Sequence, residues 1–376
     1  MKWVILLISL LLVLTACSTI EKEKERLTEE ITEKEIARIT EEKTREIIGG
    51  TSISKQQPCT IEKTIPKLSH AKYYTGPLID THVHMPVSSK IVSTVAIQSG
   101  FEDMPAYNDK LNIDYLTCLF ESEGIIQTFG FHIVPNLAIE SSLSTIQVLN
   151  ERYGDKYAHF YMPTQLGSLN PDPEKVDEIL TNNPFFKGYG EVKFDFNEIG
   201  NEGIEDPQYL EAYSLADKHN LVIMMHPASN HKSAVMRLLN KHPNTNFLFH
   251  SGNIEGWIAE VLENHKNAYY SLDANVAPLF GWASQHDLAS ATKQEFMEYM
   301  NNNFNNILQE EVRQWKPLIE EYPNQFTWGT DRWYTWHFDE DVGAMLEEFG
   351  RSFIAELDPE VQEKFAYKNA QKMMEE

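Results

Sequence analysis

The sequence predicts an α/β protein folded as a distorted (β/α)8 barrel, and three observations support this prediction. From about residue 66 onward, strand-like apolar segments alternate with helix-like segments, eight times in all. Such alternation is typical of parallel β/α units, and eight units in one domain favour a closed barrel. Several of the strand-like segments end in or near His, Glu or Asp. The carboxyl-terminal ends of the strands are where barrel-shaped enzymes place their chemistry. A doubly wound open sheet is the alternative fold.

The predicted elements follow one another in a regular order. The strands are Leu78–His84, Ile125–Val134, Tyr157–Met162, Phe185–Phe194, Leu221–His226, Thr245–His250, Ala268–Asp273 and Gln325–Asp331. The helices are Ile113–Glu123, Ser142–Tyr153, Glu174–Asn182, Tyr209–His219, Lys232–Lys241, Trp257–His265, Asp341–Glu348 and Pro359–Met374. A long connection, Ala274–Asn324, separates the last two strands. It is expected to cover the pocket, because loops after barrel strands line the active site, or to form a peripheral helical elaboration.

The beginning of the chain predicts export. Lys2 precedes an apolar run over residues 3–14, as in a signal peptide. Leu14-Thr-Ala-Cys17 resembles the lipobox of prokaryotic lipoproteins, which implies cleavage before Cys17 and attachment of lipid to its sulfur. An uncleaved membrane helix is the alternative, but the run is short for a bilayer span. We therefore expect a membrane-anchored lipoprotein on the outer face of the cell membrane or in the periplasm.

The chain divides into three parts on this interpretation. Residues 1–17 are the signal peptide with its lipobox cysteine, and residues 18–65 form a charged helical or disordered tether. Residues 66–376 form the barrel domain. A homo-oligomer is compatible with this organisation.

The charge and the cysteines restrict the partners and the compartment. The chain has 32 basic and 56 acidic residues and a net charge of −24, so a nucleic-acid backbone would be repelled. Beside Cys17, the cysteines are Cys59 and Cys118. In an oxidising compartment these two residues either pair or remain free or buried thiols.

Potential metal ligands stand at the ends of the predicted strands. His82 and His84 are two positions apart on one strand, so their side chains leave the same face. Imidazole and carboxylate groups are ligands for zinc and for other divalent metals such as Mn, Fe or Ni. Each residue has a structural alternative, such as a core histidine or a surface ion pair, but the ordered set predicts a metal site. The later candidates are Glu191, His226, His250 and Asp331.

The whole pattern resembles the amidohydrolase superfamily, most closely its amidohydrolase-related branch. The matching segments are Ile79-Asp-Thr-His-Val-His84, Lys187-Gly-Tyr-Gly-Glu191, His226-Pro227, His242-Pro-Asn-Thr-Asn-Phe-Leu-Phe-His250-Ser-Gly252, Trp328-Gly-Thr-Asp331 and Phe365-Ala-Tyr-Lys-Asn-Ala370. The resemblance implies a distorted TIM barrel of the metal-dependent hydrolase type, which holds one or two divalent ions that activate water.

The resemblance also implies roles for these residues. His82, His84 and Asp331 would bind the more buried metal, while His226 and His250 would bind the second. A bridge between two metals would come from Glu191 or from a carboxylated Lys193. With one metal only, His226 would join it and His250 would contact substrate or water. Both schemes remain open.

Catalysis and substrate binding are expected around Asp331. This residue would take a proton from water and pass it to the leaving group, and His250 would assist if it is not a ligand. Arg332 is expected either to meet a substrate carboxylate or to pair with an acidic neighbour, and Trp333 and His337 are expected near the mouth.

The expected function is hydrolysis of an amide, ester, lactone or related bond of a small molecule. The alternative is a mononuclear, non-oxidative decarboxylase of a small aromatic acid, because the same branch includes such enzymes. A non-catalytic binding lipoprotein is the third possibility, although no ligand of the set is missing. The fold itself does not choose between these functions.

Overall fold

The computed structural model describes residues 59–62, 72–90, 93–94, 104–135, 138–164, 172–193, 203–250, 254–273 and 292–375. The predicted signal peptide, Cys17, most of the predicted tether and residues 274–291 of the long connection lie outside the described residues. The side chain of Lys193 also lies outside them, although its backbone belongs to a strand.

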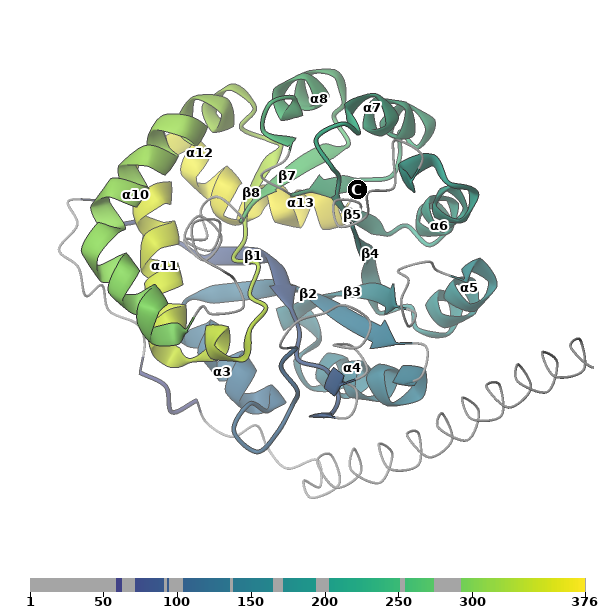
Figure 1. Cartoon of the computed structure of the whole chain (residues 1–376), viewed down its shortest axis with the longest axis horizontal. Coiled ribbons are helices and arrows are strands. Elements are labelled where there is room, and N and C mark those ends of the chain that lie inside the picture. The colour runs from purple at the N-terminus through teal and green to yellow at the C-terminus, as the bar shows by residue number, and fades with distance from the viewer. Residues whose placement is uncertain are drawn as a thin grey trace, which may run out of the picture.

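Eight parallel strands form one sheet in sequence order, as the alternation predicts. They are β1 (Leu78–His84), β2 (Ile125–Pro135), β3 (Tyr157–Thr164), β4 (Phe186–Lys193), β5 (Val222–His226), β6 (Phe247–Phe249), β7 (Ala268–Leu272) and β8 (Phe326–Trp328). The sheet curls into a nearly closed barrel (Figure 1). Just beyond β8, Asp331 N donates to His82 O at 2.8 Å and His84 N donates to Arg332 O at 2.9 Å, which joins the last strand to the first. The predicted barrel is therefore confirmed.

Helices surround the barrel (Figure 1). They are α3 (Ile113–Ser122), α4 (Ile139–Tyr153), α5 (Pro173–Asn182), α6 (Pro207–Lys218), α7 (Lys232–Lys241), α8 (Ile258–Asn264), α10 (Lys293–Glu321), α11 (Glu340–Ile354), α12 (Pro359–Glu363) and α13 (Asn369–Glu375). Short 3-10 turns occupy Gly154–Lys156, Gly203–Glu205 and Thr335–Phe338, and a π-helical turn, Lys364–Lys368, joins α12 to α13. The predicted closing helix is thus divided into three segments.

The long connection between β7 and β8 contains α10, which begins at a capping box formed by Thr292 and Glu295. Its buried side chains, among them Phe296 and Trp315, pack in the outer core, and the helix lies beside α11 (Figure 1). This described half of the connection is therefore a peripheral elaboration.

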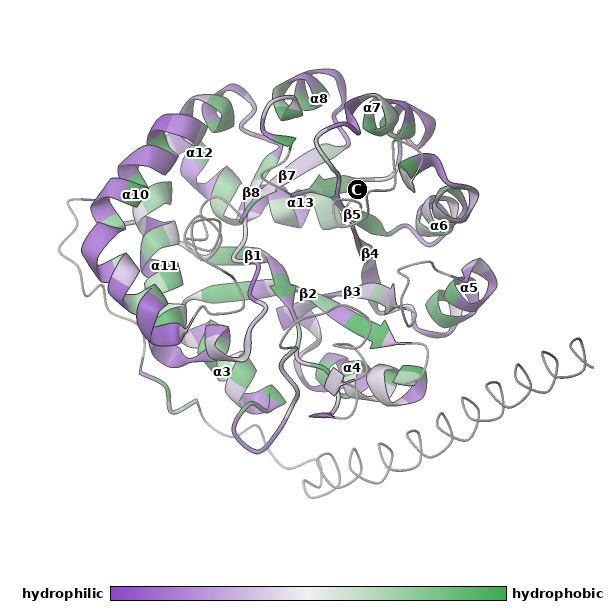
Figure 2. Cartoon of the chain, in the orientation of Figure 1, coloured by the Kyte–Doolittle hydropathy of each residue, from purple (hydrophilic) through white to green (hydrophobic). Residues whose placement is uncertain are grey.

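The apolar core has two layers. One layer fills the barrel itself and includes Ile79, Phe131, Phe160 and Met224. The other lies between the strands and the helices, whose apolar faces turn toward the sheet while their polar faces turn outward (Figure 2). Helix α13 contributes Met373 to the inner layer and so covers the amino-terminal ends of the strands. The opposite, carboxyl-terminal end is left for the site.

A disulfide joins Cys59, which precedes the barrel, to Cys118 in α3. Of the two states expected for these cysteines, the structure has the paired one. Among the described residues, no helix is long and apolar enough to cross a membrane.

Candidate metal centre

An irregularity in β1 turns the two histidines toward the barrel interior. Leu78 packs in the outer core and Ile79 in the inner core, so strict alternation would place His82 and His84 on the outer side with Leu78. The register against β2 shifts between Asp80 and Val83, as in a β-bulge. The His82 ring consequently lies 4.8 Å from the ring of Phe131, inside the barrel.

A second irregularity, in β4, turns the side chain of Glu191 toward the barrel interior. The register against β5 shifts between Tyr189 and Val192, and both of these residues pack in the outer core. Gly190 has a φ of +112°, and a Cβ there would lie 2.4 Å from the carbonyl oxygen of Met224. Glycine is therefore required at this position, and the Glu191 carboxylate faces the histidines of β1.

Four side chains from β1, β4 and the end of β8 surround one point. The Nε2 atom of His82 lies 3.4 Å from Asp331 Oδ1 and 3.9 Å from Glu191 Oε2. The Nε2 atom of His84 lies 3.2 Å and 3.5 Å from the same two oxygens. Ligands about 2.0–2.1 Å from a tetrahedral metal lie roughly 3.3 Å from one another. The four donor atoms thus have the spacing of metal ligands rather than of hydrogen-bonded pairs.

The chemistry of these donors also fits a metal. Among the described residues, the buried Nε2 atom of His82 has no hydrogen-bond partner, and a buried polar atom of this kind is costly unless something binds it. The set contains two imidazoles and two carboxylates, which suit a divalent ion. His82, His84 and Asp331 form one of the groups of side chains able to hold an ion.

A second group lies beside the first and shares Glu191. The Oε1 atom of Glu191 is 2.9 Å from His226 Nδ1 and 2.5 Å from His250 Nε2. One carboxylate therefore faces the first group through Oε2 and the second through Oε1, as a bridging ligand would. Glu191, His226 and His250 can hold an ion, but their spacing in the structure is that of hydrogen bonds.

Asp273, just after β7, belongs to the site and is absent from the residues predicted above. Its carboxylate lies 2.7 Å from His82 Nδ1 and 3.3 Å from His250 Nδ1. A carboxylate on the far nitrogen fixes the tautomer and the orientation of a ligating histidine. Its position at the end of a predicted strand was the signal that could have identified it.

Arg332 does not reach the mouth of the site. It is fully buried and forms an ion pair with Glu123, with N–O distances of 3.1 and 2.6 Å. Of its two expected roles, the structure has the pairing with an acidic neighbour, because the guanidinium lies against Glu123 and the ring of Phe120 at the end of α3.

His337 is also turned inward, where the expectation was a place near the mouth. It is buried, and its Nδ1 atom accepts hydrogen bonds from the backbone N–H groups of Trp333 and Tyr334 at 2.9 and 3.2 Å. The imidazole therefore holds the turn after Asp331. Trp333 is partly exposed, and its ring centroid lies 4.2 Å from that of His84. Of Arg332, Trp333 and His337, it is therefore Trp333 that borders the site.

Burial and neighbouring charges shift the pKa values of several residues of the site. Burial lowers the pKa of His82, although nearby carboxylates oppose the shift. Burial alone would also lower the pKa of His250, but the carboxylates of Asp273 and Glu191 raise it well above its ordinary value. The pKa of Asp331 is raised by burial, against the opposing effect of the histidines. The carboxylates of Asp273 and Glu191 therefore favour the protonated form of the His250 imidazole.

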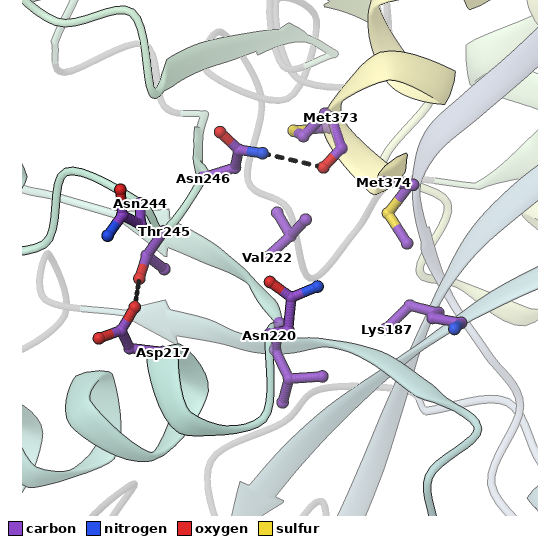
Figure 3. A pocket seen from close by; sticks show the side chains of 10 residues that line it. Lys187, Asp217, Asn220, Val222, Asn244, Thr245, Asn246, Met373 and Met374 are labelled. Carbon is purple, nitrogen blue, oxygen red and sulfur yellow. Dashed lines mark hydrogen bonds between the residues drawn. The ribbon is translucent and has the colours of Figure 1, made fainter. Parts of the chain in front are cut away.

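A surface pocket at the other end of the molecule is unrelated to this centre (Figure 3). It is lined by residues at the starts of β4 and β5, including Lys187 and Val222, and by Met373 and Met374 of α13. Barrel enzymes place their chemistry at the opposite ends of the strands. The pocket contains none of the potential ligands.

The fold and this centre define a class of protein: a β/α-barrel enzyme with a candidate metal site at the carboxyl-terminal ends of its strands. Residues 79–374 match the family model described as amidohydrolase. The chain therefore belongs to the amidohydrolase family, which comprises metal-dependent hydrolases and related enzymes. No match is found among curated proteins.

Solved structures similar to this chain include an amidohydrolase, a probable hydrolase and a decarboxylase. An amidohydrolase from Burkholderia multivorans with bound zinc is 10% identical, with a TM-score of 0.50, over 80% of this chain and 99% of that one. A probable 2-pyrone-4,6-dicarboxylic acid hydrolase from Acinetobacter baumannii is 11% identical, with a TM-score of 0.48 and the same coverage. A dihydroxybenzoic acid decarboxylase from Polaromonas sp. JS666 with bound manganese is 12% identical, with a TM-score of 0.47, over 80% and 97%.

Proposed function

We propose that this amidohydrolase family member hydrolyses an amide, ester, lactone or related bond of a small molecule with the help of one or two divalent ions, zinc foremost. The observation that carries the proposal is the group of His82, His84, Glu191 and Asp331, whose donor atoms are 3.2–3.9 Å apart. A divalent ion held there would lower the pKa of bound water and polarise the scissile bond.

The side chains around this group have complementary tasks. Asp331 has a side chain that is 9% exposed, so its carboxylate can accept a proton from water and return it to the leaving group. Asp273 holds the rings of His82 and His250. His250 Nε2 can donate a hydrogen bond to the substrate oxygen on which negative charge develops, provided that it leaves Glu191 Oε1 and that no second ion takes it.

The number of ions bears on the alternative function. The first group already has the spacing of a metal site, whereas His226 and His250 lie at hydrogen-bond distance from Glu191. This difference favours one ion over two and keeps a mononuclear, non-oxidative decarboxylase as the second candidate. A bridge by Glu191 or by a modified Lys193 would instead accompany two ions.

The proposed location is outside the cytoplasm, with a lipid anchor at Cys17. The disulfide between Cys59 and Cys118 supports an oxidising compartment, where such bonds form and persist. In this arrangement residues 18–65 would tether the domain to the membrane, and the partner would be a small-molecule substrate.

The test is metal content together with turnover. The full chain is purified in detergent without chelator, and metal per chain is measured by mass spectrometry. Turnover is assayed with 4-nitrophenyl esters, N-acyl 4-nitroanilides and aromatic lactones, and carbon dioxide release is assayed with 2,6-dihydroxybenzoate. About two ions per chain with hydrolysis supports the bridged site, and about one ion with carbon dioxide release supports the alternative.

Variants connect the result to the site. His82→Ala should lose the metal and the turnover, and Asp331→Asn should lose most of the turnover. The matched control is His219→Ala, because His219 pairs with Asp177 on the surface, away from the centre. Unchanged turnover in His82→Ala and Asp331→Asn would show that the chemistry does not take place at this group.

A further inference from the structure

An apolar cluster stands beside the metal centre at the carboxyl-terminal ends of the first strands. It consists of Val87, Met104, Ile133, Ala138 and Met162, all of them buried, and we call it the apolar wall. Ile133 and Met162 lie near the ends of β2 and β3. Side chains at the ends of barrel strands are those that border the active site. The wall therefore lies at the same end of the barrel as the centre.

Trp333 connects the apolar wall to the metal ligands. Its indole packs against the wall and meets the ring of His84 edge to face, with the ring centroids 4.2 Å apart. Unlike the wall, Trp333 is partly exposed. Part of its ring can therefore contact a molecule bound at the centre.

The turn that carries Trp333 is held rigidly. His337 accepts hydrogen bonds from the N–H groups of Trp333 and Tyr334, and Arg332 is fixed by Glu123. Burial and the nearby Arg332 lower the pKa of His337 well below its ordinary value, so the imidazole stays neutral and its Nδ1 atom remains an acceptor. The indole is consequently presented in a preformed position, which lowers the entropic cost of binding.

The charges at this end of the barrel disfavour an anionic substrate. Arg332 is fully buried in its ion pair and cannot meet a carboxylate. The segments that follow the strands, read from the sequence, contain Lys90 and Lys110 as their other basic residues, both before β2, and β4 itself ends in Lys193. The same segments contain many more Asp and Glu residues. A negative substrate would be repelled by this excess of acidic charge.

We propose that the substrate carries an uncharged aromatic or aliphatic group next to the bond that is cleaved, and that this group binds on Trp333 in front of the apolar wall. The inference rests on the proposed hydrolase and specifies its substrate class. Trp333 is thereby a specificity-determining residue, whereas Arg332 and His337 are positioning residues that act through the turn.

The test uses hydroxamates, which bind a divalent ion through two oxygens and differ in the group that they place beside it. The full chain, loaded with zinc, is titrated by calorimetry with acetohydroxamate, benzohydroxamate and 4-carboxybenzohydroxamate. Benzohydroxamate should bind roughly tenfold or more tightly than acetohydroxamate, because its ring is removed from water against an aromatic platform. The carboxylated compound should bind more weakly than benzohydroxamate.

Variants test whether Trp333 causes the preference for benzohydroxamate. Trp333→Ala should reduce the preference for benzohydroxamate over acetohydroxamate to about threefold or less, and Trp333→Phe should retain most of it. The matched control is Tyr153→Ala, because Tyr153 is a partly buried aromatic residue at the end of α4 whose hydroxyl donates to Asp114 of α3, away from the centre, and this variant should keep the wild-type preference. Metal content and circular dichroism verify that each variant is folded and loaded.

Several results would overturn the inference. They are equal affinity of the wild type for the first two compounds, tightest binding of the carboxylated one, no binding of any of them to the zinc-loaded protein, or an unchanged preference in Trp333→Ala. The proposed function fails separately, if no ester, anilide or lactone is hydrolysed. A retained preference for benzohydroxamate would then still support the apolar platform.

Discussion

The ion pair between Arg332 and Glu123 provides a quantitative test of how the turn after β8 is held. The Arg332 side chain is 0% exposed and that of Glu123 is 1% exposed, and both N–O contacts are direct, at 2.6 and 3.1 Å. Neither charge has access to water. Replacement of one partner therefore leaves the other buried without its direct partner, with only weaker compensation from Asp80 and Glu347 for Arg332 or from Arg351 for Glu123.

The expected magnitudes follow from this burial. Glu123→Leu or Arg332→Met alone should destabilise the fold by about 3–5 kcal/mol. The double variant should lose clearly less than the sum, because two apolar side chains replace a desolvated pair, an exchange that is often neutral or stabilising. The two substitutions should therefore show a coupling free energy of a few kcal/mol, as residues in direct contact do.

The assay is urea unfolding of the wild type, the two single variants and the double variant at pH 7.5. Unfolding is followed by circular dichroism, and metal content is measured on the same samples. Each single variant should also bind less metal, since Arg332 O accepts the hydrogen bond from His84 N and the residue follows Asp331 directly. Additive destabilisation by the two substitutions would refute the reasoning. It would mean that the two side chains do not compensate each other's charge in the folded protein.

Three further predictions concern separate features of the molecule. Asp273→Asn should weaken zinc binding by about 10–100-fold in a chelator competition, because the charge behind His82 is removed; unchanged affinity would contradict the orienting role. Gly190→Ala should lower the melting temperature by several degrees, on the order of 2 kcal/mol or more, since the backbone there has a φ of +112° and a Cβ would clash with a neighbouring carbonyl. Gly154→Ala, where a Cβ would meet open space, is its control and should change little. Burial and nearby carboxylates raise the pKa of Glu311 to about 8, so this group costs stability progressively as the pH rises from its ordinary carboxyl pKa to about 8. Glu311→Gln should therefore stabilise the protein by on the order of 2 kcal/mol at pH 8.5 and have little effect at pH 4.5; an effect independent of pH would exclude this cause.

The order of the strands and the positions of most potential ligands could be predicted because they depend on local patterns. Apolar runs and their spacing identified the strand from Leu78 to His84 with the observed bounds. His226 is the last residue of a strand in which Val222 and Met224 face the barrel interior, so its inward direction follows from simple periodicity. The same holds for His250 beyond β6, where Leu248 faces inward.

Directions that depend on irregular backbone could not be predicted in this way. Strict alternation from Tyr189, which packs outward, would turn Glu191 away from the site. The shift in register around Gly190 reverses this direction, and the spacing of apolar residues does not reveal a bulge. The glycine before the carboxylate was the available signal, because glycine inside a strand often marks such an irregularity.

The roles of Arg332 and His337 depended on contacts far along the chain. Glu123 lies at the end of α3, and the Cβ that Gly343 lacks would lie 2.0 Å from its carboxylate. The glycine therefore leaves room for the pair, and no pattern near Arg332 indicates this arrangement. A charged residue next to a catalytic carboxylate suggests a substrate contact by proximity alone, whereas its burial depends on the packing of α3 and α11.

The spacing of the donor atoms leads to a last physical argument about the two metal groups. The first group is held apart by backbone links between β1 and β8, since Asp331 N and His84 N both donate hydrogen bonds across this junction. His82 and His84 therefore keep distances of 3.4 and 3.2 Å from Asp331 Oδ1 that do not depend on hydrogen bonds between these side chains. In the second group, Glu191 Oε1 contacts both His226 and His250, and these hydrogen bonds would have to be given up before a second ion could bind. The first ion should consequently bind more tightly than the second. Zinc titration followed by calorimetry should show two unequal steps or a single step near one ion per chain, and two equal steps near two ions would contradict this order.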